Sequence, residues 1–320
     1  MFSYSRQGKR GLACRIVPFI LFAVLIAISG NEPAAMAAQP QQKTFKSAEA
    51  AVKALVDATR ADDIAALEAL FGPGSKNIIS SGDEVDDARG RAMFVKSYDD
   101  AHRLEKVSDK KRILYVGKDD WPMPVPIVKI GKLWHFNTQE GREEILSRRI
   151  GKNEIGAIQT CLAIVDAEKE YATLDRDNNQ LLEYAQKFES TKGKTDGLYW
   201  ETEPGAPLSP MGPLVARAVG EGYKNPEQLS PYHGYFFRIL KAQGENAKGG
   251  AYSYMVNDSL IGGFAIVAFP AAYRASGVKT FLVNHEGVVY EKDLGPETSR
   301  LAEAMTVFDP DKSWTKVEAQ

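Results

Sequence analysis

Several side chains with oxygen donors stand close together midway along the chain, within the stretch TLDRDNNQLLEYA. They are Asp175, Asp177, Asn179 and Glu183. Carboxylate and amide oxygens at alternate positions are the ligands with which an EF-hand calcium loop begins. That loop also needs a glycine and a closing bidentate carboxylate, and here those positions hold Gln180 and Gln186. Two interpretations stay open, a calcium site and a plain turn in which Asp and Asn accept backbone hydrogen bonds. We predict no other cofactor.

A second group of residues could support acid–base chemistry. Asp99 and His102 are three positions apart in DDARGRAMFVKSYDDAHRL, a stretch with helical spacing. Side chains at that spacing on a helix share a face, so the carboxylate could orient the imidazole as a general base. A polar helix face without a reaction is the alternative. Because the sequence has no G-x-S-x-G, P-loop, dinucleotide-binding or H-E-x-x-H motif, it favours a protein that is not an enzyme.

A third group suits binding rather than catalysis. Asp119, Asp120 and Trp121 precede a segment with proline at every second position. Proline has no N–H for a sheet ladder, so the segment is predicted to be an edge strand or an extended loop. An exposed tryptophan beside two carboxylates could bind a peptide or a glycan. An edge that is protected against aggregation is the alternative.

The first residues have the pattern of a secretory signal. A basic segment precedes the apolar run IVPFILFAVLIAISG, and Ala35 and Ala37 provide the small residues of an A-x-A cleavage site. The run is shorter than the roughly 20 residues that a membrane-spanning helix needs. We therefore predict a signal peptide at residues 1–37 and a polar leader at 38–43. After cleavage the protein would be periplasmic or secreted and would have no membrane span.

Composition narrows the possible partners. The formal net charge of −2 becomes more acidic without the basic signal segment, which argues against nucleic acid as a partner. Cys161 would be the remaining cysteine, so no internal disulfide is expected. It stands among Ile158, Leu162 and Val165, and its thiol is predicted to be buried and unreactive. The mature length suits two domains.

Residues 44–140 are predicted to form the first of these domains. The stretch TFKSAEAAVKALVDATRADDIAALEALFGPGS predicts two helices, capped by Ser47 and by either Asp62 or Asp63. A third helix is predicted to continue to Leu104. The stretches KRILYVG, WPMPVPIVKI and GKLWHFN then predict an antiparallel sheet, which makes the fold class α+β. This order of elements resembles the cone-shaped fold of the nuclear-transport-factor-two superfamily.

Residues 141–316 are predicted to form a second α+β domain, followed by a tail at 317–320. A long helical stretch starts at Gln139, and strands follow in YHGYFFRIL, GGFAIVAFPAAY, FLVNHEG and VVYEKDLG. The helix NEIGAIQTCLAIVDAEKEYA with this run of strands resembles the globular domain of type IV pilins and pseudopilins. A pilin carries a long apolar helix before that point, where this chain has the charged stretch GREEILSRRIGKNE.

Further stretches extend the comparison over nearly all of the mature chain. They include SSGDEVDD, DDWPMPVPIV, GREEILSRRIGKNE, PYHGYFFRIL, GGFAIVAFPAAY and FLVNHEGVVYEKDLGP. In these stretches the chain resembles a family of bacterial exported proteins catalogued as domain of unknown function 2950. The resemblance implies a periplasmic location and supplies no catalytic residues.

Together these observations predict an exported protein of the bacterial envelope that binds or scaffolds other molecules without catalysing a reaction. Envelope proteins, peptides and glycans are the partners considered. Two alternatives stay open: an envelope enzyme with an acid–base site in the N-terminal domain, and an accessory factor of a pilus or type II secretion system. The last rests on a shared fold alone.

Overall fold

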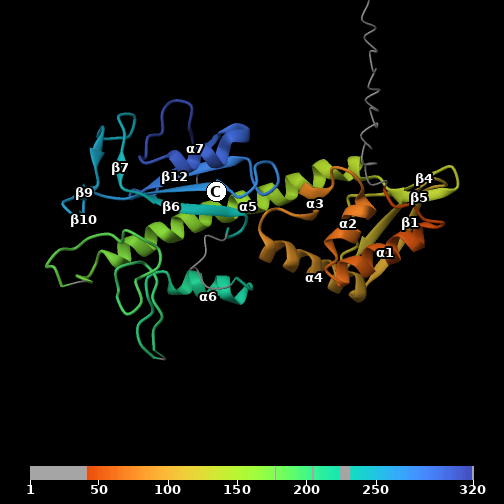
Figure 1. Cartoon of the computed structure of the whole chain (residues 1–320), viewed down its shortest axis with the longest axis horizontal. Helices are drawn as coiled ribbons and strands as arrows, with labels where there is room; N and C mark the ends of the chain where they lie inside the picture. Colours follow the sequence, from red (N-terminus) through yellow and green to blue (C-terminus); the bar gives the residue numbers. More distant parts are fainter. Residues whose placement is uncertain (1–41, 177, 204, 224–230, 319–320) are drawn as a thin grey trace, which may run out of the picture. The chain divides into compact units, whose positions relative to one another are not determined.

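The computed structural model describes residues 42–176, 178–203, 205–223 and 231–318. Helices and antiparallel sheets make up this part of the chain, which confirms the α+β class (Figure 1). The predicted signal peptide at 1–37 lies outside the described residues. Within the described part, each helix is too short or too polar to span a bilayer.

The helices of the N-terminal part are held at their first turns by side-chain caps. They are α1 (Ala48–Arg60), α2 (Ile64–Phe71), α3 (Lys76–Ile79) and α4 (Glu84–Asp100). Ser47 accepts a hydrogen bond of 3.1 Å from the backbone N–H of Ala50 at the start of α1. Of the two cap candidates for α2, Asp63 makes the bond, at 2.9 Å to the N–H of Ala66. Asp62 instead has a φ of 54° and forms an ion pair with Arg91.

An antiparallel sheet follows α4. Its strands are β1 (His102–Ser108), β2 (Lys111–Val116), β3 (Trp121–Pro122), β4 (Ile127–Ile130) and β5 (Leu133–Phe136). The order is β1-β2-β4-β5, and the short β3 pairs with β2. Trp121 and Pro122 therefore lie in a strand of two residues, as the alternating prolines predicted for an edge strand.

The predicted third helix ends earlier than its sequence pattern suggested. Ala101 leaves α4 in an extended conformation, with φ −164° and ψ 141°. From His102 onward the backbone pairs with β2, starting with His102 opposite Val116. The expectation that the helix reaches Leu104 was therefore wrong, because the hydrogen bonds of a sheet ladder replaced those of another helical turn.

A single helix of 34 residues, α5 (Thr138–Tyr171), runs from the N-terminal sheet into the C-terminal part (Figure 1). It continues without a break through Gly141, where the second predicted domain begins. A Cβ at Gly141 would lie 2.5 Å from the carbonyl oxygen of Pro124, so glycine is what lets α5 approach the segment between β3 and β4 this closely. The division into domains at 140/141 stays a prediction.

The C-terminal part is built on a second antiparallel sheet, in the order β14-β13-β12-β11-β6. Its strands are β6 (Tyr235–Leu240), β11 (Ala265–Pro270), β12 (Lys279–Asn284), β13 (Val289–Asp293) and β14 (Thr315–Lys316). Two short pairs accompany it, β7 (Ala242–Gln243) with β8 (Tyr252–Ser253) and β9 (Met255–Val256) with β10 (Ser259–Leu260). The remaining helices are α6 (Gly212–Gly220), η1 (Gly295–Glu297) and α7 (Thr298–Ala304).

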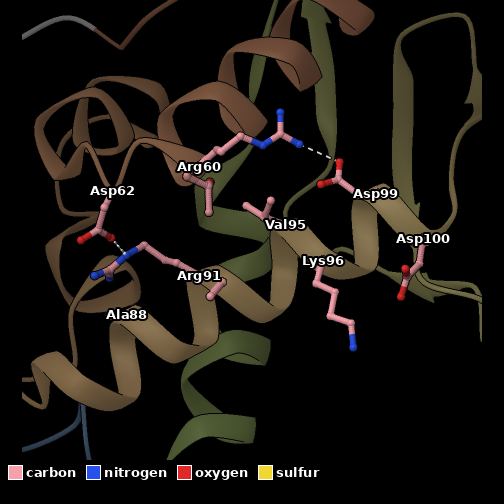
Figure 2. A pocket seen from close by; sticks show the side chains of 10 residues that line it. Arg60, Asp62, Ala88, Arg91, Val95, Lys96, Asp99 and Asp100 are labelled. Carbon is pink, nitrogen blue, oxygen red and sulfur yellow. Dashed lines mark hydrogen bonds and ion pairs between the residues drawn. The ribbon is translucent and has the colours of Figure 1, made fainter. Parts of the chain in front are cut away.

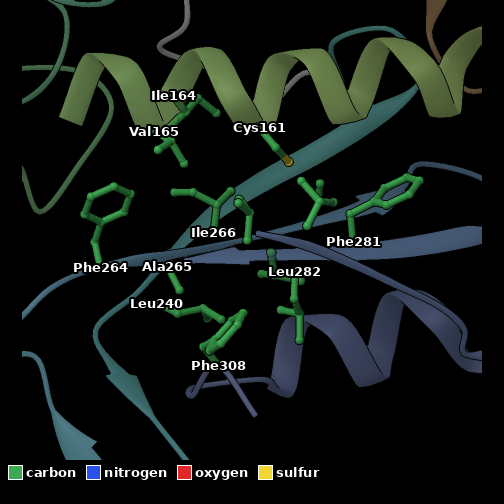
Figure 3. Close-up of a cluster of buried hydrophobic side chains, with 14 of the residues drawn as sticks. Cys161, Ile164, Val165, Leu240, Phe264, Ala265, Ile266, Phe281, Leu282 and Phe308 are labelled. Atoms are coloured by element: carbon green, nitrogen blue, oxygen red, sulfur yellow. The ribbon is translucent and has the colours of Figure 1, made fainter. Parts of the chain in front are cut away.

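Hydrophobic side chains form two clusters, and α5 contributes to both. Leu146 packs with α1, α2 and the N-terminal sheet, whereas Cys161 and Ile164 pack with the C-terminal sheet. Figure 3 shows α5 on one face of that sheet and the last helix on the other. Every residue of β11 is buried, which accounts for its continuous apolar sequence. Burial raises the pKa of the Cys161 thiol, in agreement with an unreactive cysteine.

Candidate ligand-binding groove

A groove with a volume of about 410 Å³ opens between α4 and the first half of α5. We call this cavity the groove. Its apolar lining comes from α1, α2, α3, α4, β3 and α5, and consists of Leu55, Leu67, Phe71, Ile78, Ile79, Phe94, Trp121, Met123, Pro124 and Ile145. Ligand pockets in proteins occupy a range of about 300–1,000 Å³ and are mostly apolar. The groove therefore has the size and the surface of a small-molecule site.

Gly90 is the α4 residue of the lining that has no side chain. It lies in the middle of α4 and lines the groove, where almost any other residue would favour the helix more. A Cβ built at this position would meet no described atom within 4 Å, so the space beside it is empty. Gly90 is exposed, so a side chain at this position would have room beside the groove.

Charged side chains surround the apolar lining. They are Asp86, Asp87, Arg91, Arg148, Arg149 and Lys152. Lys152 pairs with Asp86 at 3.1 Å, and Arg148 pairs with Glu144 at 2.6 Å. Asp87 accepts a hydrogen bond of 2.8 Å from the backbone N–H of Ser81. Most of these charges are therefore already matched by a partner from the protein.

Arg149 differs from the other cations of the groove. Its Nη1 and Nη2 donate to the carbonyl oxygens of Asn77 and Ile78, each at 2.7 Å, and so hold α3 against α5. No carboxylate among the described residues lies within ion-pairing distance of its guanidinium. Burial lowers the pKa of Arg149, while the charges of Asp87 and Asp86 act in the opposite direction from farther away.

Trp121 joins the predicted binding surface to the groove. Its side chain lines the groove, and the guanidinium of Arg148 lies 5.5 Å from its ring centroid. Asp120 points elsewhere and accepts a hydrogen bond of 3.0 Å from Arg103. Asp119 is exposed and does not line the groove. Of the three residues singled out in the sequence, the structure brings Trp121 alone to this cavity.

Comparison with protein families gives one match. The family described as "Protein of unknown function (DUF2950)" matches residues 42–317. The chain belongs to the DUF2950 family. Searches of curated proteins and of solved structures found no match. In this DUF2950 protein, every residue that lines the groove falls inside the matched region.

The predicted acid–base pair of the DUF2950 protein is not assembled. Asp99 forms an ion pair of 2.6 Å with Arg60, and both side chains line a surface pocket of about 550 Å³ (Figure 2). His102 lies in β1, with its ring stacked on Tyr98 at 3.8 Å and its Nδ1 2.8 Å from the carbonyl oxygen of that residue. The expectation that the two side chains share a helix face was wrong, because α4 ends between them at Asp100.

The described residues of the calcium-like stretch form a turn. Asp177 lies outside them. Asp175 accepts hydrogen bonds from the backbone N–H groups of Asn179 at 3.2 Å and Gln180 at 2.9 Å. The side chain of Asn179 donates to Glu183 at 3.0 Å. In the described part of the DUF2950 chain, no cluster of three or more His, Cys, Asp or Glu side chains is arranged to hold a metal ion. The calcium site and the plain turn both stay predictions.

Two buried carboxyl groups, those of Asp83 and Glu168, were not identified from the sequence. Asp83 caps α4 through its Oδ1, which accepts a hydrogen bond from the N–H of Asp86. Its Oδ2 accepts two more hydrogen bonds, from the hydroxyl of Tyr223 at 2.7 Å and from the N–H of Gly234 at 2.9 Å. Burial and the bond to Asp83 raise the pKa of Tyr223. Glu168 is completely buried on α5. An aspartate just before a helix is a recognisable cap signal, but its long-range partners are not visible in the sequence.

Proposed function

We propose that this DUF2950 protein is an exported, non-enzymatic binding protein of the cell envelope, and that the groove holds an apolar ligand. The observation that carries the proposal is the empty apolar groove beside Gly90. In this lining Trp121 is exposed and Phe94, Pro124 and Ile145 are partly exposed, so these are the apolar side chains that a ligand would cover. The predicted signal peptide at 1–37 supports an envelope location.

Binding has more support than catalysis in the N-terminal part. The titratable groups around the groove are engaged in ion pairs and backbone hydrogen bonds that hold the fold. Asp99 and His102 are exposed and have different partners. A helix-covered sheet that encloses a ligand pocket is also what the resemblance to the cone-shaped fold implies for this region. The pilin-like resemblance of the C-terminal part suggests no ligand.

Filling the groove tests the proposal. Gly90→Leu should place an isobutyl group in the cavity without straining the backbone, because the Cβ position is open. Gly151→Leu is the matched control, since Gly151 is also a helical glycine with open space at its Cβ but does not line the groove. The probe is the neutral dye N-phenyl-1-naphthylamine, whose fluorescence rises in apolar surroundings.

We expect the wild type and Gly151→Leu to bind the dye with similar affinity. Gly90→Leu should bind it about tenfold more weakly or not at all, because the leucine occupies the place of a ligand group of similar size. Circular dichroism should show the same helix content for all three proteins. Wild-type affinity in Gly90→Leu, or no dye binding by the wild type, would refute the groove as the binding site.

A further inference from the structure

We infer that the ligand of the groove is an amphipathic molecule with a carboxylate head group, and that Arg149 binds this carboxylate. The inference rests on the proposed function, because it concerns the same cavity. It adds the chemical class of the ligand and the residue that recognises its polar end.

The apolar lining accounts for one end of such a ligand. Phe71, Phe94 and Met123 provide aromatic and thioether surface, and Ile78 and Ile79 provide branched aliphatic surface. None of these side chains can satisfy a buried polar group, so the part of the ligand in contact with them must be apolar. An alkyl chain meets this requirement.

The charges of the lining account for the other end. Four cations and two carboxylates line the groove, and two of the cations, Arg91 and Arg148, pair with Asp62 and Glu144 outside the lining. Asp86 is bound by Arg89 and Lys152, and Asp87 is bound by the N–H of Ser81. Both carboxylates therefore already have partners within the protein. Arg149 is therefore the groove cation that has no ion pair among the described residues, with Asp87 and Asp86 acting on it from farther away, and it is the group to which an anionic ligand would bind.

The donors of Arg149 match a carboxylate. A guanidinium has five N–H donors, and two of them are used by the carbonyl oxygens of Asn77 and Ile78. The other three have no hydrogen-bond partner among the described residues. Burying a cation without a counter-ion is unfavourable, and a planar carboxylate can relieve this through two parallel hydrogen bonds. The same carbonyl bonds hold the guanidinium in place before the ligand arrives.

Arg149 also lies at the correct place for an amphipathic molecule. It holds the carbonyl of Ile78, whose side chain belongs to the apolar lining. The polar anchor and the apolar surface are thus adjacent. Arg148 adds a second positive charge above Trp121 at the exposed rim.

Isothermal titration with decanoate, decanol and decyl phosphate tests the inference. Wild-type protein should bind decanoate about tenfold or more tightly than decanol, since a hydrogen-bonded charge pair in a partly buried site is worth at least that factor. Arg149→Gln should abolish this preference while the affinity for decanol stays the same. Arg142→Gln is the matched control, because Arg142 lies on the same helix and does not line the groove.

Several results would overturn the inference and leave the proposed function standing. One is equal affinity of the wild type for decanol and decanoate. Another is a preference for decyl phosphate, which would assign the head group to the phosphate class. Displacement of the dye by an apolar peptide but not by decanoate would assign the groove to a peptide. If Arg149→Gln does not fold, the wild-type comparison of the three ligands decides the question. Failure of the dye and of every alkyl ligand to bind would refute the proposed function itself.

Discussion

Glu168 accepts a hydrogen bond of 2.8 Å from the backbone N–H of Ala185 through Oε2, while its Oε1 has no partner among the described residues. The side chain is completely buried in the C-terminal core. Burial raises the pKa of this carboxyl well above its ordinary value of 4.5, and the bond from Ala185 offsets part of the effect. The carboxyl group is therefore held in its neutral form over a wider pH range than an exposed glutamate.

Glu168→Gln should stabilise the protein progressively as the pH rises. In the wild type the unfolded chain releases the Glu168 proton above about pH 4.5, whereas the folded chain retains it to higher pH, so folding stability is lost with increasing pH. Glutamine keeps an oxygen for the Ala185 N–H and cannot ionise. Urea unfolding of both proteins at several pH values between 5 and 8.5 measures the difference. The exposed Glu170→Gln change is the control, and a difference that did not grow with pH would contradict the prediction.

Gly141→Ala should destabilise the fold by about 1–3 kcal/mol, the usual range for overpacking. The new Cβ would lie 2.5 Å from the carbonyl oxygen of Pro124 and 2.7 Å from Cα of Val125, and both belong to backbone that cannot rotate away. Gly90→Ala, in open space on α4, should instead stabilise the protein by about 0.5–1 kcal/mol through helix propensity. Thermal melts of the two variants should shift in opposite directions. A rise in melting temperature for Gly141→Ala would show that α5 does not pack this closely.

Asp83→Ala should cost about 2–4 kcal/mol, because it removes a helix cap and leaves two buried donors without an acceptor. Those donors are the hydroxyl of Tyr223 and the N–H of Gly234. Tyr223→Phe should cost less, since it keeps the helix cap and removes two hydrogen bonds, the one donated to Asp83 and the one accepted from the N–H of His233 at 3.2 Å. Denaturant unfolding of both variants and of the double mutant gives their coupling energy. Additive effects would contradict a direct bond, and Glu84→Ala, an exposed change in the same turn, provides the baseline.

Millimolar calcium should leave the melting temperature unchanged relative to a chelator. Asp175 already uses its carboxylate oxygens for the backbone N–H groups of Asn179 and Gln180, as expected for a turn. A bound ion would stabilise the folded state in proportion to the logarithm of its concentration. Differential scanning calorimetry measures this directly. A calcium-dependent rise that disappears in Asp175→Asn would instead establish the metal site.

Local patterns in the sequence predicted much of the fold. Ser47 and an aspartate before α2 were recognisable as caps because a cap depends on neighbouring backbone groups. The apolar run of β11 was recognisable because both of its faces are covered. The end of α4 was missed, since the pairing of His102 with Val116 depends on a strand that lies later in the chain. Long-range pairing of this kind leaves no local signal.

The groove was harder to predict than the elements that form it. Trp121 was predicted from the sequence as a candidate binding residue on an exposed edge, with a protected edge as the alternative. Gly90 was not, because an empty space has no residue pattern of its own. Arg149 looked like one charge among many in GREEILSRRIGKNE, and only its contacts with α3 distinguish it. A cavity is a property of tertiary packing, so sequence periodicity alone could not reveal it.

The burial of Cys161 has a practical consequence for studying the groove in solution. A native thiol that solvent does not reach should not react with a maleimide reagent under native conditions. In a protein with Cys14 replaced by serine, Gly90→Cys would then direct a fluorophore to the groove, at a position where α4 accepts a side chain without strain. Emission from that label would report occupancy of the groove in real time, in crude envelope extracts as well as with purified ligands.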